Sequence, residues 1–206
     1  MMTREDFAER TGVSRETLER YETWRRLLVE WSAHTNLVGR ATLDDFWHRH
    51  ALDSWQVTQI LPARGRWADL GSGAGFPGLA VAFAMQEAGE GEVVLVESIG
   101  KKAAFLKEVA DATGAPAHIA PVRAETLDKG TGFDVVTARA MAALPKLLSY
   151  AHPLLKKGGK GLFLKGSKHQ DEIAEARKAW RFETRLHESL TGGGGTIIEI
   201  TELAHV

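Results

Sequence analysis

Hydrophobic and polar residues follow two different rhythms along the chain, and the change between them divides it. The N-terminal part carries aromatic side chains such as Tyr21 and Trp24 at helical spacing, which predicts amphipathic helices whose aromatic stripe packs in a core. From Trp67 onward, short apolar runs alternate with helical patterns. We therefore expect an N-terminal helical segment at 1–62, packed on a main domain at 63–206.

The main domain contains five apolar runs with the length and composition of buried parallel strands. They lie at residues 67–70, 93–97, 117–122, 133–140 and 161–166. A turn is predicted at 154–160, just before the last of these runs. The tail then alternates polar and apolar residues at 180–190 and 196–203, on either side of Gly192–Gly195. This pattern predicts an α/β fold: a doubly wound, mostly parallel, seven-stranded sheet with an antiparallel C-terminal hairpin.

Composition limits the possible functions. With 206 residues, of which 44% are hydrophobic, the chain can bury one full core. It has no cysteine, which excludes disulfides, zinc-thiolate sites and thiol nucleophiles, and we predict no metal site. No apolar run is long enough to span a membrane and the N-terminus is charged, so we expect a cytoplasmic protein without membrane partners. The net charge of −1 means that any nucleic-acid binding must depend on a local patch.

Glycines interrupt the chain directly after the first predicted strand. Gly71, Gly73, Gly75 and Gly78 separate this strand from an apolar helical run, which places a tight turn at a helix N-terminus. Glycine is needed where the backbone takes a positive φ or where a ligand must approach the main chain closely. A glycine turn without a ligand is the alternative, and it is disfavoured because each glycine costs conformational entropy. The loop therefore predicts a cofactor cradle.

Two cofactors compete for this loop. The run Gly73–Gly78 fits the G-x-G-x-x-G dinucleotide fingerprint, with Glu97 at a suitable distance to hold a ribose. Asp69, two residues before Gly71, would repel a pyrophosphate but suits the ammonium and sulfonium end of S-adenosylmethionine (AdoMet). We favour AdoMet over NAD on this ground. The C-terminal hairpin agrees, because such hairpins are typical of doubly wound AdoMet-dependent methyltransferases.

Charged residues follow the ends of the later strands. Glu97 is expected beside the glycine loop, where it could accept hydrogen bonds from both ribose hydroxyls; alternatively it caps the next helix. Glu125 could accept from an adenine amino group, or it is a surface acid. Arg139 and Lys165 end the fourth and fifth strands. Two cations on one rim of the crevice indicate an anionic substrate, although both could also be solvated surface charges.

A second cationic group precedes the main domain. His48, Arg49 and His50 either face the crevice or form a solvated helix face. The residues alone leave these two possibilities open.

The methyl acceptor can be narrowed by elimination. Methylation of pyrimidine C5 uses a cysteine, which the chain lacks. The fourth strand ends in Thr137–Ala140, not in the N/D-P-P-aromatic loop that orients exocyclic amines, and it has no acid that would activate a lysine for ribose 2′-O transfer. Guanine N7 remains, because its lone pair is available and no proton must leave before attack. We therefore favour guanine N7 as the acceptor, with positioning as the main task of the protein.

Several of these stretches together resemble one protein family. Between about residues 20 and 166 the chain is similar to the RsmG (GidB) family, on seven stretches: 36–38, 49–54, 69–78, 97–102 with 105–106, 123–125, 137–140 and 164–166. The pair Arg-His-x-x-Asp-Ser and Gly-x-Gly-Phe-Pro-Gly is far more specific than a glycine loop. The resemblance implies a bacterial AdoMet-dependent methyltransferase that acts on guanine N7 of small-subunit (16S) ribosomal RNA.

The resemblance also implies roles for individual residues. It implies AdoMet contacts at Gly71, Phe76, Ala124, Glu125 and Arg139, with Glu97 at the ribose. It further implies that Arg49, His50, Arg139 and Lys165 face the RNA or the methionine carboxylate, and these four are the candidate catalytic residues. The partner would be 16S ribosomal RNA or a small-subunit assembly particle, bound by a monomer.

The tail departs from the family pattern. Where family members often carry basic residues, this chain has Thr191–Gly195 and a C-terminus that ends in Val206. Two other functions compete with the methyltransferase. One is a nicotinamide oxidoreductase, against which Asp69 argues. The other is an AdoMet-sensing RNA-binding module, which would bind both ligands and transfer no methyl group.

Overall fold

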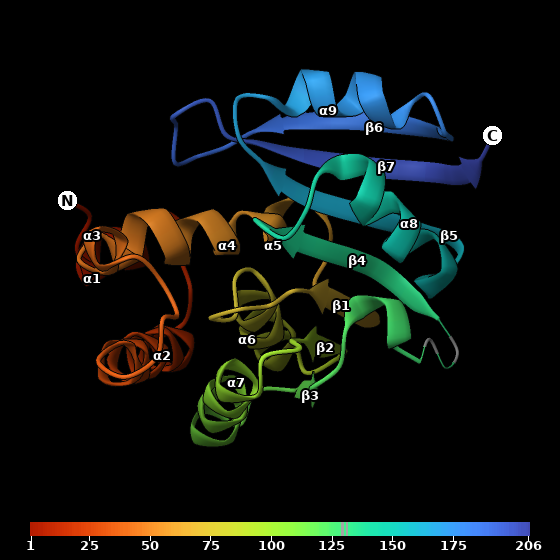
Figure 1. Ribbon diagram of the computed structural model, residues 1–206. Helices are drawn as coiled ribbons and strands as arrows, with labels where there is room; N and C mark the ends of the chain where they lie inside the picture. Colours follow the sequence, from red (N-terminus) through yellow and green to blue (C-terminus); the bar gives the residue numbers. More distant parts are fainter. Residues whose placement is uncertain (129, 131) are drawn as a thin grey trace.

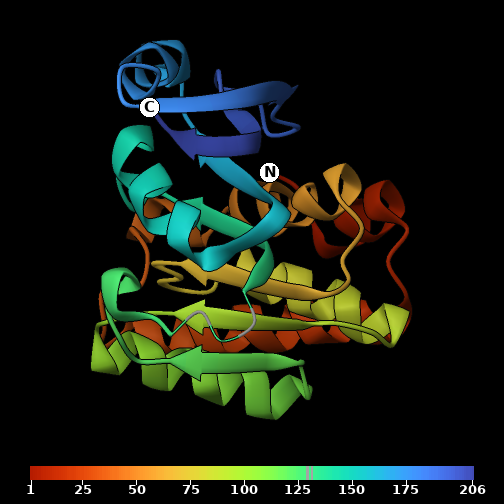
Figure 2. The same ribbon diagram turned by 90° about the vertical axis from the view of Figure 1, so that its right-hand side faces the viewer.

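The sheet confirms the predicted fold class. The computed structural model describes residues 1–128, 130 and 132–206, and its strands form one sheet of seven in the order β3-β2-β1-β4-β5-β7-β6. The first five strands in this order are parallel, whereas β7 is antiparallel to β5 and β6 to β7. Figures 1 and 2 show the β6–β7 hairpin at one edge of the sheet and β3 at the other. The strands are β1 (Arg66–Leu70), β2 (Glu92–Val96), β3 (Ala117–Ala120), β4 (Phe133–Arg139), β5 (Leu155–Lys165), β6 (Trp180–Glu188) and β7 (Thr196–His205).

The part of the chain before β1 is helical, as expected. It contains α1 (Arg4–Thr11), α2 (Arg15–Ser32), α3 (Arg40–Leu43), the π-helix η1 (Trp47–Leu52), α4 (Asp53–Trp55) and α5 (Val57–Ile60). The helices after β1 are α6 (Gly78–Ala88), α7 (Gly100–Thr113), the 3₁₀-helix η2 (Ala124–Thr126), α8 (Leu144–Leu154) and α9 (His169–Ala176). Within the described residues, no helix combines the length and the apolar character needed to cross a bilayer.

Successive residues of β1 point into two different cores, because side chains alternate across a strand. In β1, Trp67 belongs to the core shared with α6, α7 and the N-terminal helices. Its neighbours Ala68 and Leu70 belong to the core that α8 closes on the opposite face. In Figure 1 the N-terminal helices accordingly lie on the same side as α6 and α7. The crevice at the strand ends is thus supported from both faces.

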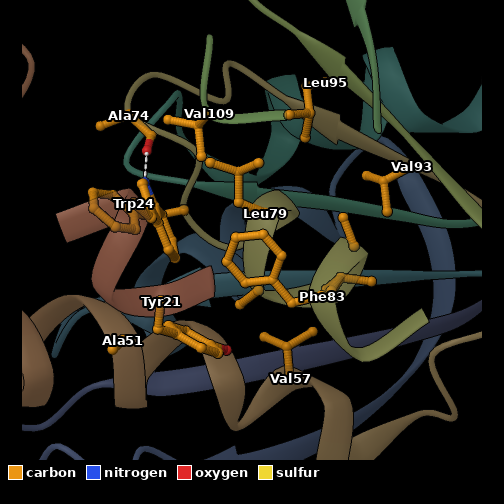
Figure 3. Close-up of a cluster of buried hydrophobic side chains, with 14 of the residues drawn as sticks. Tyr21, Trp24, Ala51, Val57, Ala74, Leu79, Phe83, Val93, Leu95 and Val109 are labelled. Carbon is orange, nitrogen blue, oxygen red and sulfur yellow. Dashed lines mark hydrogen bonds between the residues drawn. The ribbon is translucent and has the colours of Figure 1, made fainter. Parts of the chain in front are cut away.

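The helix α2 carries the aromatic stripe into the first core. Ser14 caps this helix by accepting a hydrogen bond from the Thr17 backbone N–H at 3.1 Å. Tyr21 and Trp24 are at most 1% exposed, and Figure 3 shows them beside Phe83 of α6. The N-terminal segment therefore shares a core with the main sheet. The proposed boundary after residue 62 falls in the turn between α5 and β1, and the division into two domains remains a prediction.

The prediction of a turn at 154–160 is wrong. The helix α8 ends at Leu154 and β5 begins directly at Leu155. Between the pairs Phe133–Leu155 and Val135–Lys160, β5 advances by five residues while β4 advances by two. A bulge thus absorbs the lysine- and glycine-rich stretch within the strand, with Gly158 at a φ of 76°.

Candidate functional site

The carboxyl ends of four parallel strands bring the predicted residues to one edge of the sheet. The strands β1 and β4 are neighbours, but the chain proceeds from β1 toward β2 and β3 on one side, and from β4 toward β5 on the other. Such a switch point opens a crevice at the carboxyl ends, where open α/β sheets bind ligands. The glycine loop and Glu97 directly follow β1 and β2, and Arg139 and Lys165 are the last residues of β4 and β5.

The glycine loop has the backbone that its sequence indicated. Gly71, Gly73 and Gly75 have φ values of 64°, 57° and 96°, a region that other residues rarely adopt. A Cβ added to Gly73 would have the Gly71 carbonyl oxygen, 3.8 Å away, as its nearest neighbour. The space above Gly73 is therefore open, so a side chain there would fill a cradle and not displace protein atoms.

Asp69 lies underneath this loop. Its side chain is fully buried; Thr137 donates a hydroxyl hydrogen bond to Oδ1 at 2.9 Å and the Gly78 backbone N–H donates to Oδ2 at 3.3 Å. Burial raises the pKa of Asp69 to about 6, and the hydrogen bonds partly oppose this shift. A Cβ on Gly78 would lie 2.7 Å from Asp69 Oδ2, so glycine permits this close approach. The structure thus shows an anchor for the start of α6, and the predicted contact of Asp69 with a cationic cofactor remains a prediction.

Glu97 joins the two turns that follow β1 and β2. Its carboxylate is buried and accepts hydrogen bonds from the Gly73 backbone N–H at 2.9 Å and from the Ile99 backbone N–H at 2.8 Å. Ile99 precedes α7 as its N-cap residue, so the capping alternative describes one of these contacts. A carboxylate has about four lone-pair sites. Two of them are left for ribose hydroxyls.

Ala124 and Glu125 lie on η2, after β3. Ala124 is buried and Glu125 is exposed, with the Tyr150 hydroxyl donating to its Oε1 at 2.9 Å. Hydrogen bonds from its own backbone N–H and from Tyr150 hold the pKa of Glu125 below its usual range. Both residues line a cavity of about 420 Å³. Glu125 is therefore an ionised acceptor with a fixed orientation, as an adenine amino group would require.

Arg139 is the meeting point of three separate stretches of sequence. Its Nη1 donates to Asp53 Oδ2 at 2.7 Å and to the Arg49 carbonyl at 3.2 Å, and its Nη2 lies 3.0 Å from His50 Nδ1. The guanidinium also lies over the Phe76 ring, 4.6 Å from its centroid. The His50 ring stacks on the same Phe76 at 4.5 Å with an interplanar angle of 13°. The Arg-His motif and the glycine loop thus contact each other, and both contact Arg139.

His50 is neutral in this arrangement. Burial is the main cause that lowers its pKa to about 3, followed by the charges of Arg139 and Arg49; the Thr42 backbone opposes the shift. Because a guanidinium can only donate, Nδ1 of His50 must accept the hydrogen bond from Arg139, which leaves the proton on Nε2. The Arg49 side chain is exposed, whereas His50 is 5% exposed. The solvated-face interpretation therefore describes Arg49 and fails for His50.

Lys165 lies at the end of β5, next to Arg139. Its Nζ contacts Glu172 Oε2 at 2.6 Å and donates to the Ala142 carbonyl at 2.6 Å. Arg139 and Lys165 line one cavity of about 390 Å³, together with Asp53 and Glu172. The structure therefore brings the two predicted rim cations together and places a carboxylate beside each of them.

The sequence alone did not reveal the polar residues that complete this cavity. Ser189 and Thr191, from the turn between β6 and β7, line it. Gln56 connects them to the Arg-His stretch: its Nε2 donates to Asp53 Oδ1 at 2.9 Å and to Ser189 Oγ at 3.1 Å, and its Oε1 accepts from the Leu190 backbone N–H at 2.8 Å. Asp53 belongs to the Arg-His-x-x-Asp-Ser motif, whose arginine and histidine are predicted site residues. Ser189 and Thr191 lie more than 130 positions further along the chain, and no local pattern marks them. The atypical tail thus contributes hydroxyl groups to the cavity.

Comparison with known proteins identifies relatives over nearly the whole chain. The family model described as rRNA small subunit methyltransferase G matches residues 16–200. A protein of Bradyrhizobium sp. (strain ORS 278) named ribosomal RNA small subunit methyltransferase G is 47% identical over 193 residues, which cover 92% of this chain and 86% of that protein.

Solved structures with much lower identity share the fold. The N-methyltransferase NodS from Bradyrhizobium japonicum, in complex with S-adenosylhomocysteine, has a TM-score of 0.54 at 10% identity and covers 85% of this chain and 97% of its own. A class I AdoMet-dependent methyltransferase candidate from Listeria monocytogenes has a TM-score of 0.63 at 13% identity, covering 88% and 68%. The fold is therefore that of class I methyltransferases, and the chain belongs to the family of rRNA small subunit methyltransferase G.

Proposed function

We propose that this protein transfers a methyl group from AdoMet to N7 of a guanosine in 16S ribosomal RNA. The observation that carries the proposal is the convergence of an open glycine loop and a two-cation cavity at one switch point of the sheet. Family membership supports the same reaction class. We further propose that the protein acts as a monomer in the cytoplasm, on ribosomal RNA that is either free or in a small-subunit assembly particle.

The residues around the glycine loop suit AdoMet. Glu97 has acceptor sites left for the ribose hydroxyls, Glu125 would accept from the adenine amino group, and buried Ala124 would line the ring. Gly71 and Gly73 would let the cofactor approach the main chain. When bound, AdoMet supplies an electrophilic methyl group.

The cavity beside the loop suits an acceptor that keeps no proton on the reacting atom. Asp53 and Glu172 are engaged with Arg139 and Lys165, and His50 is neutral, buried and hydrogen-bonded to Arg139. These groups are therefore suited to bind and orient a substrate, and poorly suited to remove a proton from it. Guanine presents O6 and N7 as acceptors, and RNA adds phosphate oxygens. Arg139, Lys165 and exposed Arg49 supply the donors for such groups.

Mass spectrometry of ribosomal RNA nucleosides tests the proposal. Small-subunit RNA from cells that lack this modification is incubated with the protein and deuterium-labelled AdoMet, both as free RNA and as assembled particles. We expect labelled 7-methylguanosine in at least one substrate. Binding of S-adenosylhomocysteine and RNA without any transfer would instead support a sensing module. Binding of NADH without S-adenosylhomocysteine would support an oxidoreductase.

A further inference from the structure

The glycine loop receives a hydrogen bond from a helix of the N-terminal segment. The indole Nε1 of Trp24, on α2, donates a hydrogen bond to the Ala74 carbonyl at 2.9 Å. Figure 3 shows this bond reaching from the core to the loop. Trp24 is fully buried and Ala74 is 3% exposed. A buried hydrogen bond of this kind leaves a costly unpaired carbonyl when its donor is removed.

This bond fixes a peptide unit in the middle of the cradle. The Ala74 carbonyl and the Gly75 N–H belong to the same planar peptide group, and that N–H donates to the Ser72 carbonyl at 2.7 Å. Gly73 and Gly75, on either side of Ala74, both have positive φ, and glycine backbones have the most freedom to rotate. With Trp24 in place, both ends of this peptide group are held.

Trp24 also supports the next residues of the loop by packing. Its ring lies 4.8 Å from the Phe76 ring. Phe76 in turn stacks on His50 and lies beneath Arg139. The N-terminal segment thus contacts the loop at a carbonyl and at an aromatic ring.

The chain offers a matched comparison in Trp31. This residue lies on the same helix and also donates its indole N–H, to Glu108 Oε2 on α7 at 2.9 Å. Its ring packs edge-on against Phe105, also on α7, with 5.9 Å between the ring centroids. Trp31 therefore joins the same two regions of the protein, and neither its indole hydrogen bond nor its ring contact involves the glycine loop.

We infer that Trp24 is a positioning residue for the cofactor loop, and that the N-terminal segment is for this reason part of the cofactor site. The role of Trp24 in holding the loop does not depend on the proposed function, whereas its effect on cofactor affinity rests on that function. Without the indole N–H the loop samples more conformations. The apparent dissociation constant then rises as the competent fraction falls.

Two phenylalanine variants test this inference. Trp24→Phe and Trp31→Phe each remove one indole N–H and keep an aromatic ring. Calorimetric titration with S-adenosylhomocysteine should give a dissociation constant about five- to tenfold higher for Trp24→Phe, and within about twofold of wild type for Trp31→Phe. In steady-state assays the loss should fall on KM for AdoMet, with kcat at saturation largely retained.

Hydrogen exchange supplies a readout that needs no cofactor. The amides of residues 71–75 should exchange faster in Trp24→Phe than in Trp31→Phe or wild type. Equal loop exchange and equal affinity in the two variants would overturn the inference, even if both had lower melting temperatures. If wild-type protein ignored S-adenosylhomocysteine, the proposed function would fail, whereas the exchange comparison would still decide on Trp24. Should Trp24→Phe unfold, Trp24→Met takes its place, as a flexible apolar side chain without a donor.

Discussion

Single residues at the crevice have more protein partners than their positions in the sequence indicate. Arg139 contacts Asp53, His50 and Phe76 at once, and Lys165 contacts Glu172. A cation held in this way is already oriented when its ligand arrives. Preorganised donors of this kind contribute strongly to catalysis because no reorganisation is needed during the reaction.

Replacement of either rim cation should abolish most of the activity while the fold survives. Arg139→Ala and Lys165→Ala each remove a positioned donor from the cavity, and we expect methyl transfer to fall on the order of 10²-fold. The measurement is the rate of methyl incorporation into small-subunit RNA, with circular dichroism to check the fold. Turnover equal to wild type in either variant would disprove the role of that residue.

Two controls distinguish the loss of a cation from the cavity from a general loss of charge or of folding stability. Arg26→Ala removes a surface ion pair with Glu30 on α2 and should leave the rate unchanged. Arg139→Ala leaves the partly buried Asp53 carboxylate without its partner, at a cost of about 1–3 kcal/mol in the free energy of unfolding. Adding Asp53→Asn should restore part of that stability, but none of the activity.

The openness of the space above Gly73 leads to a second prediction at the residue scale. Gly73→Val should eliminate binding of S-adenosylhomocysteine, because its side chain fills the cradle. Gly12→Val is the matched control: Gly12 has a φ of 66°, and like Gly73 it has open space around an added Cβ. Both variants pay a similar strain of about 1–2 kcal/mol. Calorimetry showing retained affinity in Gly73→Val would place the cofactor elsewhere.

At the scale of elements, side chains of the N-terminal segment hold the C-terminal hairpin: Gln56 makes the shorter hydrogen bonds, and Asp53 and Arg10 add longer ones to the same turn. Gln56 of the helical segment bonds Asp53, Ser189 and the Leu190 backbone, and it is 4% exposed. Two of these partners, Asp53 and Ser189, line the two-cation cavity. The turn that departs from the family pattern is therefore positioned by a residue more than 130 positions earlier in the chain.

Removal of this amide should loosen the hairpin turn. Gln56→Ala leaves the Leu190 N–H without its acceptor and should lower the free energy of unfolding by about 1–3 kcal/mol. Gln59→Ala, which removes an exposed glutamine bonded to Thr58, should change it by less than about 0.5 kcal/mol. Urea unfolding of both variants makes the comparison. A similar effect at the two positions would contradict the role given to Gln56.

For the whole molecule, two buried groups make stability depend on pH in opposite directions. The folded-state pKa of His50, about 3, lies below the 6.5 of an unfolded chain, so the unfolded state binds more protons between these values and stability rises with pH. The folded-state pKa of Asp69, about 6, lies above its ordinary value of 3.8. Asp69 therefore contributes to the free energy of unfolding below pH 3.8, and this contribution is lost as the pH rises through 6. The two effects oppose each other between about pH 4 and 6.

A variant without the imidazole isolates one of these effects. The difference in free energy of unfolding between wild type and His50→Asn should move in favour of wild type as pH rises from about 3 to 6.5. Other titrating groups cancel in this difference. Denaturant unfolding at several pH values measures it, and a difference that stayed constant would show that His50 is not held neutral by the fold.

Local patterns were sufficient to predict the kinds of element and the ends of most strands. The strand, glycine loop and helix at residues 66–88 are set by neighbours in sequence, since glycine backbone preferences and hydrophobic periodicity act over a few residues. The bulge in β5 escaped prediction because Lys156–Gly159 has the composition of a turn. Only the register with β4 shows that the strand continues through it.

The sequence by itself thus determined the fold class, the glycine loop and the family resemblance, all of which depend on short stretches. Only the tertiary structure decided which partners hold Arg139 and Lys165, that His50 is buried and neutral, and that Trp24 reaches Ala74. Most of these contacts join residues 50 to 90 positions apart. They exist because the strand order brings the ends of distant strands to one edge and because α2 packs against the glycine loop. No local pattern records either arrangement.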